Sequence, residues 1–363
     1  LAQLHNNMGM AAVDLGDNDD ALSHYEKALE LYRAQNIKDG DVITLDNLGC
    51  LKTDPGEAAS LHKQAVDILE EIGNRQSLAT ALLHLGETQA EMGQRKEAIV
   101  TLTRSVDLLD ELALALSPND KSAFLGKNVD AYQVLVRLLV EENRDEEAFR
   151  VNERARARAL LELLGGRSAT IRKAPPNLAR REEALRARIR TVLAAPATSE
   201  NRENLASLKL EYTVLMDEIA RVDPGNAGIG ESEAPGVKTL SELLGPRRAL
   251  LEYVVHDNVT YLFVVVKGEI SAYKLDLGQD EILKLTGKWR RSSWLPPASR
   301  NSGTPPASWE CREWSFWLIP MALWRIVTDF AASWSAKFGG TGPRLFSASI
   351  LIGALVIPIG TTA

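Results

Sequence analysis

Apolar residues recur three or four positions apart through residues 1–164, the spacing of one buried face of an α-helix. A representative stretch is Leu22, Tyr25, Leu29 and Tyr32. Residues that favour turns interrupt the pattern at Gly16-Asp17, Pro55-Gly56 and Gly93-Gln94. The pattern therefore predicts antiparallel helical hairpins.

The hairpins form a repeat. Met8-Gly9, Leu48-Gly49 and Leu85-Gly86 stand at intervals of 40 and 37 residues. Each pair precedes an alanine-centred segment: Ala21-x3-Tyr25-x2-Ala28, Ala58-x3-His62-x2-Ala65 and Ala98-x3-Leu102-x2-Ser105. A fourth, degenerate copy includes Tyr132 and Ala148. One hairpin cannot bury its own apolar face, so we expect stacked copies, with a generic helical bundle as the alternative.

These residues resemble the tetratricopeptide repeat, which has Leu-Gly in its first helix and Ala-x3-aromatic-x2-Ala in its second. The resemblance covers residues 1–164 and implies an α-solenoid whose groove binds an extended peptide of a protein partner. Family groove positions carry over to Asn6, Met10, Asp46, Leu83, Glu87, Gln133 and Arg137. They lack the Lys/Asn set that clamps a peptide carboxylate, and solvated helix positions are the alternative. Because Leu1 already falls inside a first helix, we expect a longer array of which this is a fragment.

Residues 150–190 carry 12 basic and four acidic side chains, a local charge of +8. Such a segment can bind nucleic acid, but it contains no aromatic residue for base stacking. We therefore predict that its arginines form ion pairs with the acidic repeats or are solvated. Residues 165–245 read as a helical connector: helix breakers at 165–176, helix from Leu178 to Val222 with a break near Pro196, then a glycine-rich linker.

Residues 246–288 predict a three-stranded β-meander, because runs rich in β-branched and aromatic residues alternate with turns. The middle run, Tyr261 to Val266, is unbroken in its apolar character and predicts burial on both faces. Together with the preceding Glu-Arg-Ala-Arg-Ala-Arg-Ala-Leu-Leu-Glu-Leu-Leu helix, this segment resembles the start of a CHAT (caspase-like) domain, over about residues 147–277. The expected fold class is thus mainly α: an α-solenoid followed by the start of an α/β caspase-like domain.

That family implies a Cys–His peptidase dyad, which we do not expect in this chain. No histidine follows His256, and Cys311 lacks the small, strand-terminal setting of the family's cysteine. We assign no catalytic residue. The function expected is a protein-binding scaffold fused to an incomplete CHAT domain. The alternative is a caspase-like cysteine endopeptidase, regulated by its repeats, in a full-length parent.

Residues 289–363 differ from the rest of the chain. All seven tryptophans lie there, in a segment that is rich in proline and has no helical or strand periodicity. A reading-frame shift near Gly287 or a degenerated module would explain it. Ala354 to Gly360 is similar to a CHAT strand without its aspartate, and the apolar run 346–359 is too short for a membrane anchor.

Composition narrows the remaining classes of function. The 363 residues carry a net charge of −7, which gives no general attraction to nucleic acid, and two cysteines, which suit a reducing, cytoplasmic compartment. No phosphate-binding loop, dinucleotide fingerprint or His-Glu-x2-His motif occurs. We therefore expect no cofactor, no metal and no membrane contact. The sequence pattern does not specify the bound peptide, the oligomeric state or the number of missing repeats.

Overall fold

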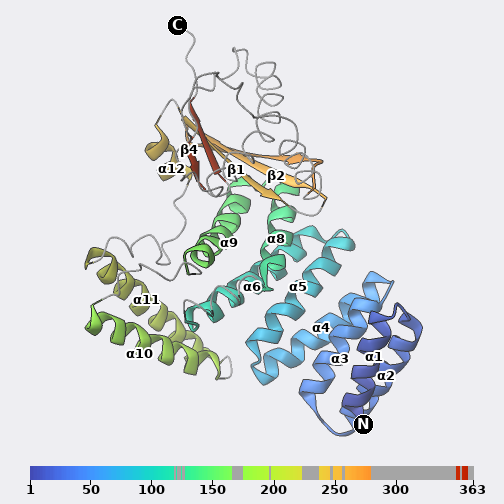
Figure 1. Cartoon of the computed structure of the whole chain (residues 1–363). Helices are drawn as coiled ribbons and strands as arrows, with labels where there is room; N and C mark the ends of the chain where they lie inside the picture. Colours follow the sequence, from blue (N-terminus) through green and yellow to red (C-terminus); the bar gives the residue numbers. More distant parts are fainter. Residues whose placement is uncertain are drawn as a thin grey trace, which may run out of the picture. The chain divides into compact units, whose positions relative to one another are not determined.

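A computed structural model describes most of the chain, which forms two compact units (Figure 1). The first unit contains Leu1–Glu142 and Arg150–Ala234, and the second contains Asn143–Phe149 and Pro235–Ala363. The described residues are 1–117, 120, 124, 127–165, 175–195, 198–222, 237–245, 248–255, 258–278, 349–351 and 354–358. His256, Cys311 and most of the 289–363 tail lie outside them, so the expectations for these positions stay predictions.

The first unit opens with the predicted helical hairpins (Figure 1). Their helices are α1 (Ala2–Asp14), α2 (Asn18–Ala34), α3 (Lys38–Leu51), α4 (Pro55–Ile72), α5 (Arg75–Glu91), α6 (Arg95–Leu114), α8 (Val129–Glu141) and α9 (Asp145–Gly165). Turns fall where the sequence predicted them: Gly16 and Gly93 have positive φ, and Pro55 occupies the first turn of α4. Asp17, Asp54 and Asn74 cap the following helices by accepting backbone N–H bonds.

The repeat's glycines mark where the two helices of each hairpin meet. A Cβ added at Gly9, Gly49 or Gly86 would lie 2.5–2.7 Å from a side chain of the second helix. The facing side chains are Tyr25, His62 and Leu102, in that order. The absence of a side chain at these glycines thus lets the two helices of each hairpin approach closely.

Two connector helices complete the first unit. They are α10 (Pro176–Leu193) and α11 (Ser199–Val222), separated near Pro196 as predicted. Leu185, Ile189, Leu208 and other apolar side chains form a shared core with Ala115 at the end of the repeats. The apolar residues of α11, among them Leu205, Leu208, Leu210, Val214, Leu215 and Ile219, suggest a helix packed along one side. Leu210 and Val214 do not follow this pattern, since they are 67% and 59% exposed, whereas Tyr212 is buried.

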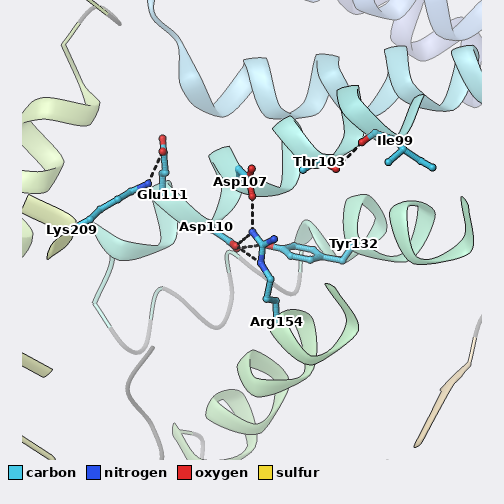
Figure 2. A network of polar contacts seen from close by, with 8 residues as sticks. All are labelled: Ile99, Thr103, Asp107, Asp110, Glu111, Tyr132, Arg154 and Lys209. Carbon is cyan, nitrogen blue, oxygen red and sulfur yellow. Dashed lines mark hydrogen bonds and ion pairs between the residues drawn. The ribbon is translucent and has the colours of Figure 1, made fainter. Parts of the chain in front are cut away.

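The arginine-rich segment forms ion pairs, as predicted. Figure 2 shows Arg154 of α9 directed at Asp107 and Asp110 of α6, while the Tyr132 hydroxyl donates to the same Asp110 carboxylate. Burial alone lowers the pKa of Arg154, but the charges and hydrogen bonds of the two aspartates raise it above its usual range.

Further along the same segment, the arginines of α10 also have acidic partners. Arg181 pairs with Glu218 at 2.8 Å, and Arg188 with Glu211 at 2.9 Å, both on α11. The acidic partners therefore lie on the connector as well as on the repeats, while side chains between 156 and 174 are outside the described residues.

The second unit contains an antiparallel sheet and the short helix α12 (Val237–Leu244). The predicted meander is confirmed as β1 (Arg248–Val255), β2 (Thr260–Val266) and β3 (Glu269–Leu275). The strands β4 (Ser349–Leu351) and β5 (Ala354–Pro358) follow, and the order is β3-β2-β1-β5-β4. All of β2 except Val266 is buried, as its unbroken apolar run predicted.

Residues at the start of α9 pack with this sheet inside the second unit. The rings of Phe149 and Phe263 meet edge to face, with centroids 5.7 Å apart. Asp145 Oδ2 accepts a hydrogen bond from the backbone N–H of Ala272 at 2.8 Å. The elements of both units confirm the mainly helical fold class. The small antiparallel sheet is compatible with the expected caspase-like start but does not establish it.

Candidate functional site

The first helices of the four hairpins form a continuous row. Helix α1 contacts α3, α3 contacts α5, and α5 contacts α8. We call α1, α3, α5 and α8 the A-helix row. The seven predicted groove residues are distributed over it: Asn6 and Met10 on α1, Asp46 on α3, Leu83 and Glu87 on α5, Gln133 and Arg137 on α8.

At the α1 end, Asn6 and Met10 have different roles. Asn6 is buried, and its Oδ1 accepts from Asn47 Nδ2 at 3.4 Å and from Thr44 Oγ1 at 3.5 Å, both on α3. Its amide also lies 3.8 Å from Met10 Sδ. Asn6 therefore joins two helices of the row, whereas Met10, 51% exposed, is available to a ligand.

Asp46 lies at the centre of a polar cluster. Its Oδ1 is 2.9 Å from His62 Nδ1 of α4 and 3.0 Å from His84 Nδ1 of α5, and Cys50 Sγ is 3.8 Å from the same His84 nitrogen. Burial alone raises the pKa of the Asp46 carboxyl, but the hydrogen bonds of the two histidines outweigh it and hold that pKa at about 2. Burial likewise opposes the charged form of His84, yet Asp46 and Cys50 raise its pKa to about 10.

The α5 and α8 end of the row carries mixed polar character. Burial raises the pKa of Glu87, and the positive charges of His84 and Arg137 counteract this only in part. Leu83 and Gln133 are half-buried, and Arg137 is exposed. Of the predicted set, Met10 and Arg137 thus offer the most accessible side chains.

The predicted set omitted His62, His84 and Cys50, which the structure places around Asp46. Two signals in the sequence concern Cys50 and His62, and neither concerns His84. Cys50 follows Asp46 by one helical turn, on the same helix face. His62 occupies the aromatic position of the second repeat, where a polar ring needs a buried partner.

A separate cavity of about 630 Å³ lies among α4, α5, α6 and α11. Arg75 is buried at its wall and donates to Glu111 at 3.3 Å, while Lys209 donates to the other Glu111 oxygen at 2.7 Å (Figure 2 shows the Lys209 bond). Within the described residues, Nε and Nη2 of Arg75 have no hydrogen-bond partner. The walls carry both signs of charge, so the cavity has no clear preference for a cation or an anion.

No helix in the described part of the chain combines the length and apolar content of a membrane span.

Comparison with known families identifies the repeats. A model described as tetratricopeptide repeat matches residues 1–71, and a second with the same description matches residues 80–108. The chain therefore contains tetratricopeptide repeats, as the sequence pattern predicted. The matched segments fall in the first three hairpins, and the fourth, α8 with α9, lies beyond both matches.

Solved structures with similarity to this chain include BtubC (BKLC) from P. vanneervenii, at 16% identity and a TM-score of 0.39, over 48% of this chain and 68% of that one. A Rap protein complexed with competence and sporulation factor matches at 14% identity and 0.38, over 61% and 64%. Aspartyl phosphate phosphatase F from Bacillus subtilis matches at 13% and 0.39, over 63% and 56%. These similarities carry no information on ligands or activity. No curated protein matches the chain.

Proposed function

We propose that the repeats are a protein-interaction scaffold that binds an extended segment of a partner protein along the A-helix row. One observation carries the proposal: the first helices of successive tetratricopeptide hairpins contact one another in sequence, so their outward positions line up across the repeats. An extended peptide is the ligand shape that such a row of helices can contact repeat by repeat.

The side chains on the row define the kind of segment. Met10 offers an exposed apolar contact and Arg137 an exposed positive charge, on the first and last helices of the row. The Lys/Asn set for a terminal carboxylate is absent from the predicted positions. We therefore propose a segment within a partner chain, with an apolar residue at the α1 end and an acidic residue at the α8 end.

Site-specific photo-crosslinking tests this proposal. A photoreactive amino acid is placed in the full chain at Met10 or Arg137, and in a control at Val100, which is 70% exposed on the second-helix side, in α6. After exposure to a cell extract, Met10 and Arg137 should capture the same discrete partner, and Val100 should not. Equal capture from all three positions, or none from the groove positions, contradicts a groove-specific scaffold.

For the second unit we propose a CHAT-like module. The arginine-rich helix followed by the confirmed meander supports this assignment, since that order of parts is what the resemblance rests on. The alternative function is a repeat-regulated cysteine endopeptidase. A thiol-reactive peptide probe separates the two: labelling of Cys311 that disappears in His256→Ala would favour the peptidase, and absence of labelling favours the scaffold.

We also propose a cytoplasmic location, without nucleic-acid or membrane partners. Its support is the low cysteine content, the free thiol of Cys50 and the ion pairing of the described arginines.

A further inference from the structure

Three potential metal ligands converge in the second and third repeats, and a fourth lies beside them. Asp46 and Cys50 come from α3, His62 from α4 and His84 from α5. The ligand atoms of Asp46, His62 and His84 all lie within 4.8 Å of one another, and Cys50 Sγ is 3.8 Å from His84 Nδ1. The His62 side chain is 2% exposed, while those of Asp46 and His84 are 20% and 28% exposed. The cluster is thus enclosed at His62 and open to solvent at Cys50 and His84.

The cluster differs from a catalytic triad because two of its side chains approach the same nitrogen of His84. In a Cys–His–Asp relay, the nucleophile and the carboxylate contact opposite nitrogens of the imidazole, so that the ring can pass a proton between them. Here Asp46 and Cys50 both approach Nδ1 of His84. The His62 Nδ1 also points to the same carboxylate. The donor atoms of Asp46, His62 and His84 thus lie together in an arrangement that a metal ion can bind, with the Cys50 thiol next to His84.

The second repeat also departs from its neighbours at this position. Tyr25 and Leu102 fill the space against the glycine of their hairpins, whereas the second hairpin has His62 against Gly49. An added Cβ at Gly49 would lie 2.5 Å from His62 Cε1, so the ring is held closely against α3. Packing alone is satisfied by an apolar ring or chain, as in the other two repeats. A histidine with Nδ1 directed at Asp46 therefore indicates a polar role.

We propose that Asp46, Cys50, His62 and His84 bind one zinc ion. Two imidazoles, a thiolate and a carboxylate are zinc ligands, and four protein ligands make a closed, structural site. Zinc bond lengths of about 2.0–2.3 Å place tetrahedral ligand atoms about 3.3–3.7 Å apart. The metal-free distances from Asp46 Oδ1 to the two histidine nitrogens, 2.9 and 3.0 Å, require only small side-chain movements. Cys50, whose Sγ lies 3.8 Å from His84 Nδ1, completes the site by turning toward the other three ligands. On binding, the ion takes the places of the Nδ1 protons of both histidines and of the Cys50 thiol proton, which pass to solvent.

The proposed site does not correspond to a short sequence motif, because its ligands are spread along the chain. They come from three helices, and only Asp46 and Cys50 are close in sequence. A bound ion would tie α3, α4 and α5 together and so join the second hairpin to the third. This inference is independent of the proposed peptide binding, since crosslinking at Met10 and Arg137 can be carried out on metal-stripped protein.

The test uses the full chain, stripped of metal with a chelator. Added zinc should raise the temperature of thermal unfolding, with one equivalent bound per chain. Cobalt(II) is the spectroscopic probe: it should give intense tetrahedral bands in the visible range and a sulfur-to-cobalt charge-transfer band in the near-ultraviolet. Cys50→Ser should abolish the charge-transfer band. His84→Ala should weaken zinc binding by more than about 100-fold, beyond the loss typical of an outer-shell partner.

His24→Ala is the matched control, because His24 and His5 form another histidine pair, with Nδ1 atoms 3.1 Å apart. It should leave zinc affinity and the cobalt spectrum unchanged. Circular dichroism of the metal-free variants shows whether each is folded, and the exposed Cys50 position carries the test should His84→Ala fail to fold. A cobalt spectrum without sulfur charge transfer, or zinc affinity that persists in folded His84→Ala protein, would overturn the proposal.

Discussion

The Arg154 network of Figure 2 makes a quantitative prediction about stability. Substitution of Arg154 by Met removes the guanidinium but keeps most of the aliphatic stem, so the change isolates the polar contacts. Those contacts are hydrogen bonds to Asp110 and Asp107, with 2.8 Å between Arg154 Nε and Asp110 Oδ2 and 2.8 Å between Arg154 Nη2 and Asp107 Oδ1. After the change, Asp110 keeps only the Tyr132 hydroxyl among the contacts drawn.

The expected loss follows from burial. The side chains of Arg154 and Asp110 are 32% and 22% exposed, so the pair is neither a solvated surface pair nor a fully buried one. A hydrogen bond to a charged group contributes about 1.5–3 kcal/mol, and an exposed ion pair about 0–1 kcal/mol. Since solvent screens part of this network, we expect Arg154→Met to lower the free energy of unfolding by about 2 kcal/mol.

The matched control is Arg181→Met, which removes an ion pair to Glu218 whose side chains are 56% and 44% exposed. It should cost about 0.5 kcal/mol or less. Urea unfolding, followed by far-ultraviolet circular dichroism, measures the free energy of unfolding of both variants. The dependence of that free energy on urea concentration (the m-value) should be the same in both. A double-mutant cycle of Arg154→Met with Asp110→Asn should give a coupling energy of about 1–2 kcal/mol.

Equal losses in Arg154→Met and Arg181→Met would refute the reasoning, because the argument depends on the difference in burial. A coupling energy near zero would do the same, since it would show that the loss does not come from the contact between Arg154 and Asp110.

Two further predictions concern the repeats. Gly86→Ala gains about 1 kcal/mol of helix propensity but places a Cβ 2.6 Å from Leu102 Cγ, so overpacking of about 1–3 kcal/mol should leave a net loss of about 1 kcal/mol in urea unfolding. Gly56→Ala, whose Cβ would meet only the Asp54 carboxyl, at 3.1 Å, is the control and should not destabilise; a loss equal to that of Gly86→Ala would count against the packing argument. Burial raises the pKa of Asp41, so its folded form holds a proton at pH values where the unfolded form has released it, and stability falls as pH rises through that window. Asp41→Asn should therefore raise the urea midpoint at about pH 7 and lose this advantage at about pH 3, and an equal effect at both pH values would contradict it.

Local sequence signals were sufficient for the repeat helices, the two connector helices and the meander, whereas the short helix α12 was not predicted. The glycine of each repeat and its facing side chain are set by close approach within one hairpin, and the strands by β-branched runs between turns, so each can be predicted from a short window. The exposed Leu210 and Val214 show the limit: α11 has apolar residues on more than one face, and only the partner helix selects the buried stripe.

The polar networks around Arg154 and Asp46 depend on contacts between residues that are far apart in the sequence. Ion pairing of the arginine-rich segment, which includes Arg154, was predicted from its charge, but the partners of Arg154 on α6 follow only from how the helices pack. The partner of His62 was hidden for a related reason: the repeat position indicates a buried ring that needs a polar partner, but not which residue that partner is. Its contact with Asp46 appears only when α3 and α4 are placed together.

The pairing of β1 has a consequence for the order of folding. Leu251 pairs with Leu355, far along the chain, whereas β1, β2 and β3 pair with their immediate neighbours in sequence. Closing the longer connection costs more chain entropy, so the meander should form first and the β1–β5 ladder last. During synthesis, one edge of β1 would then stay open until residues 354–358 emerge, and an open edge of an apolar strand can pair with another nascent chain.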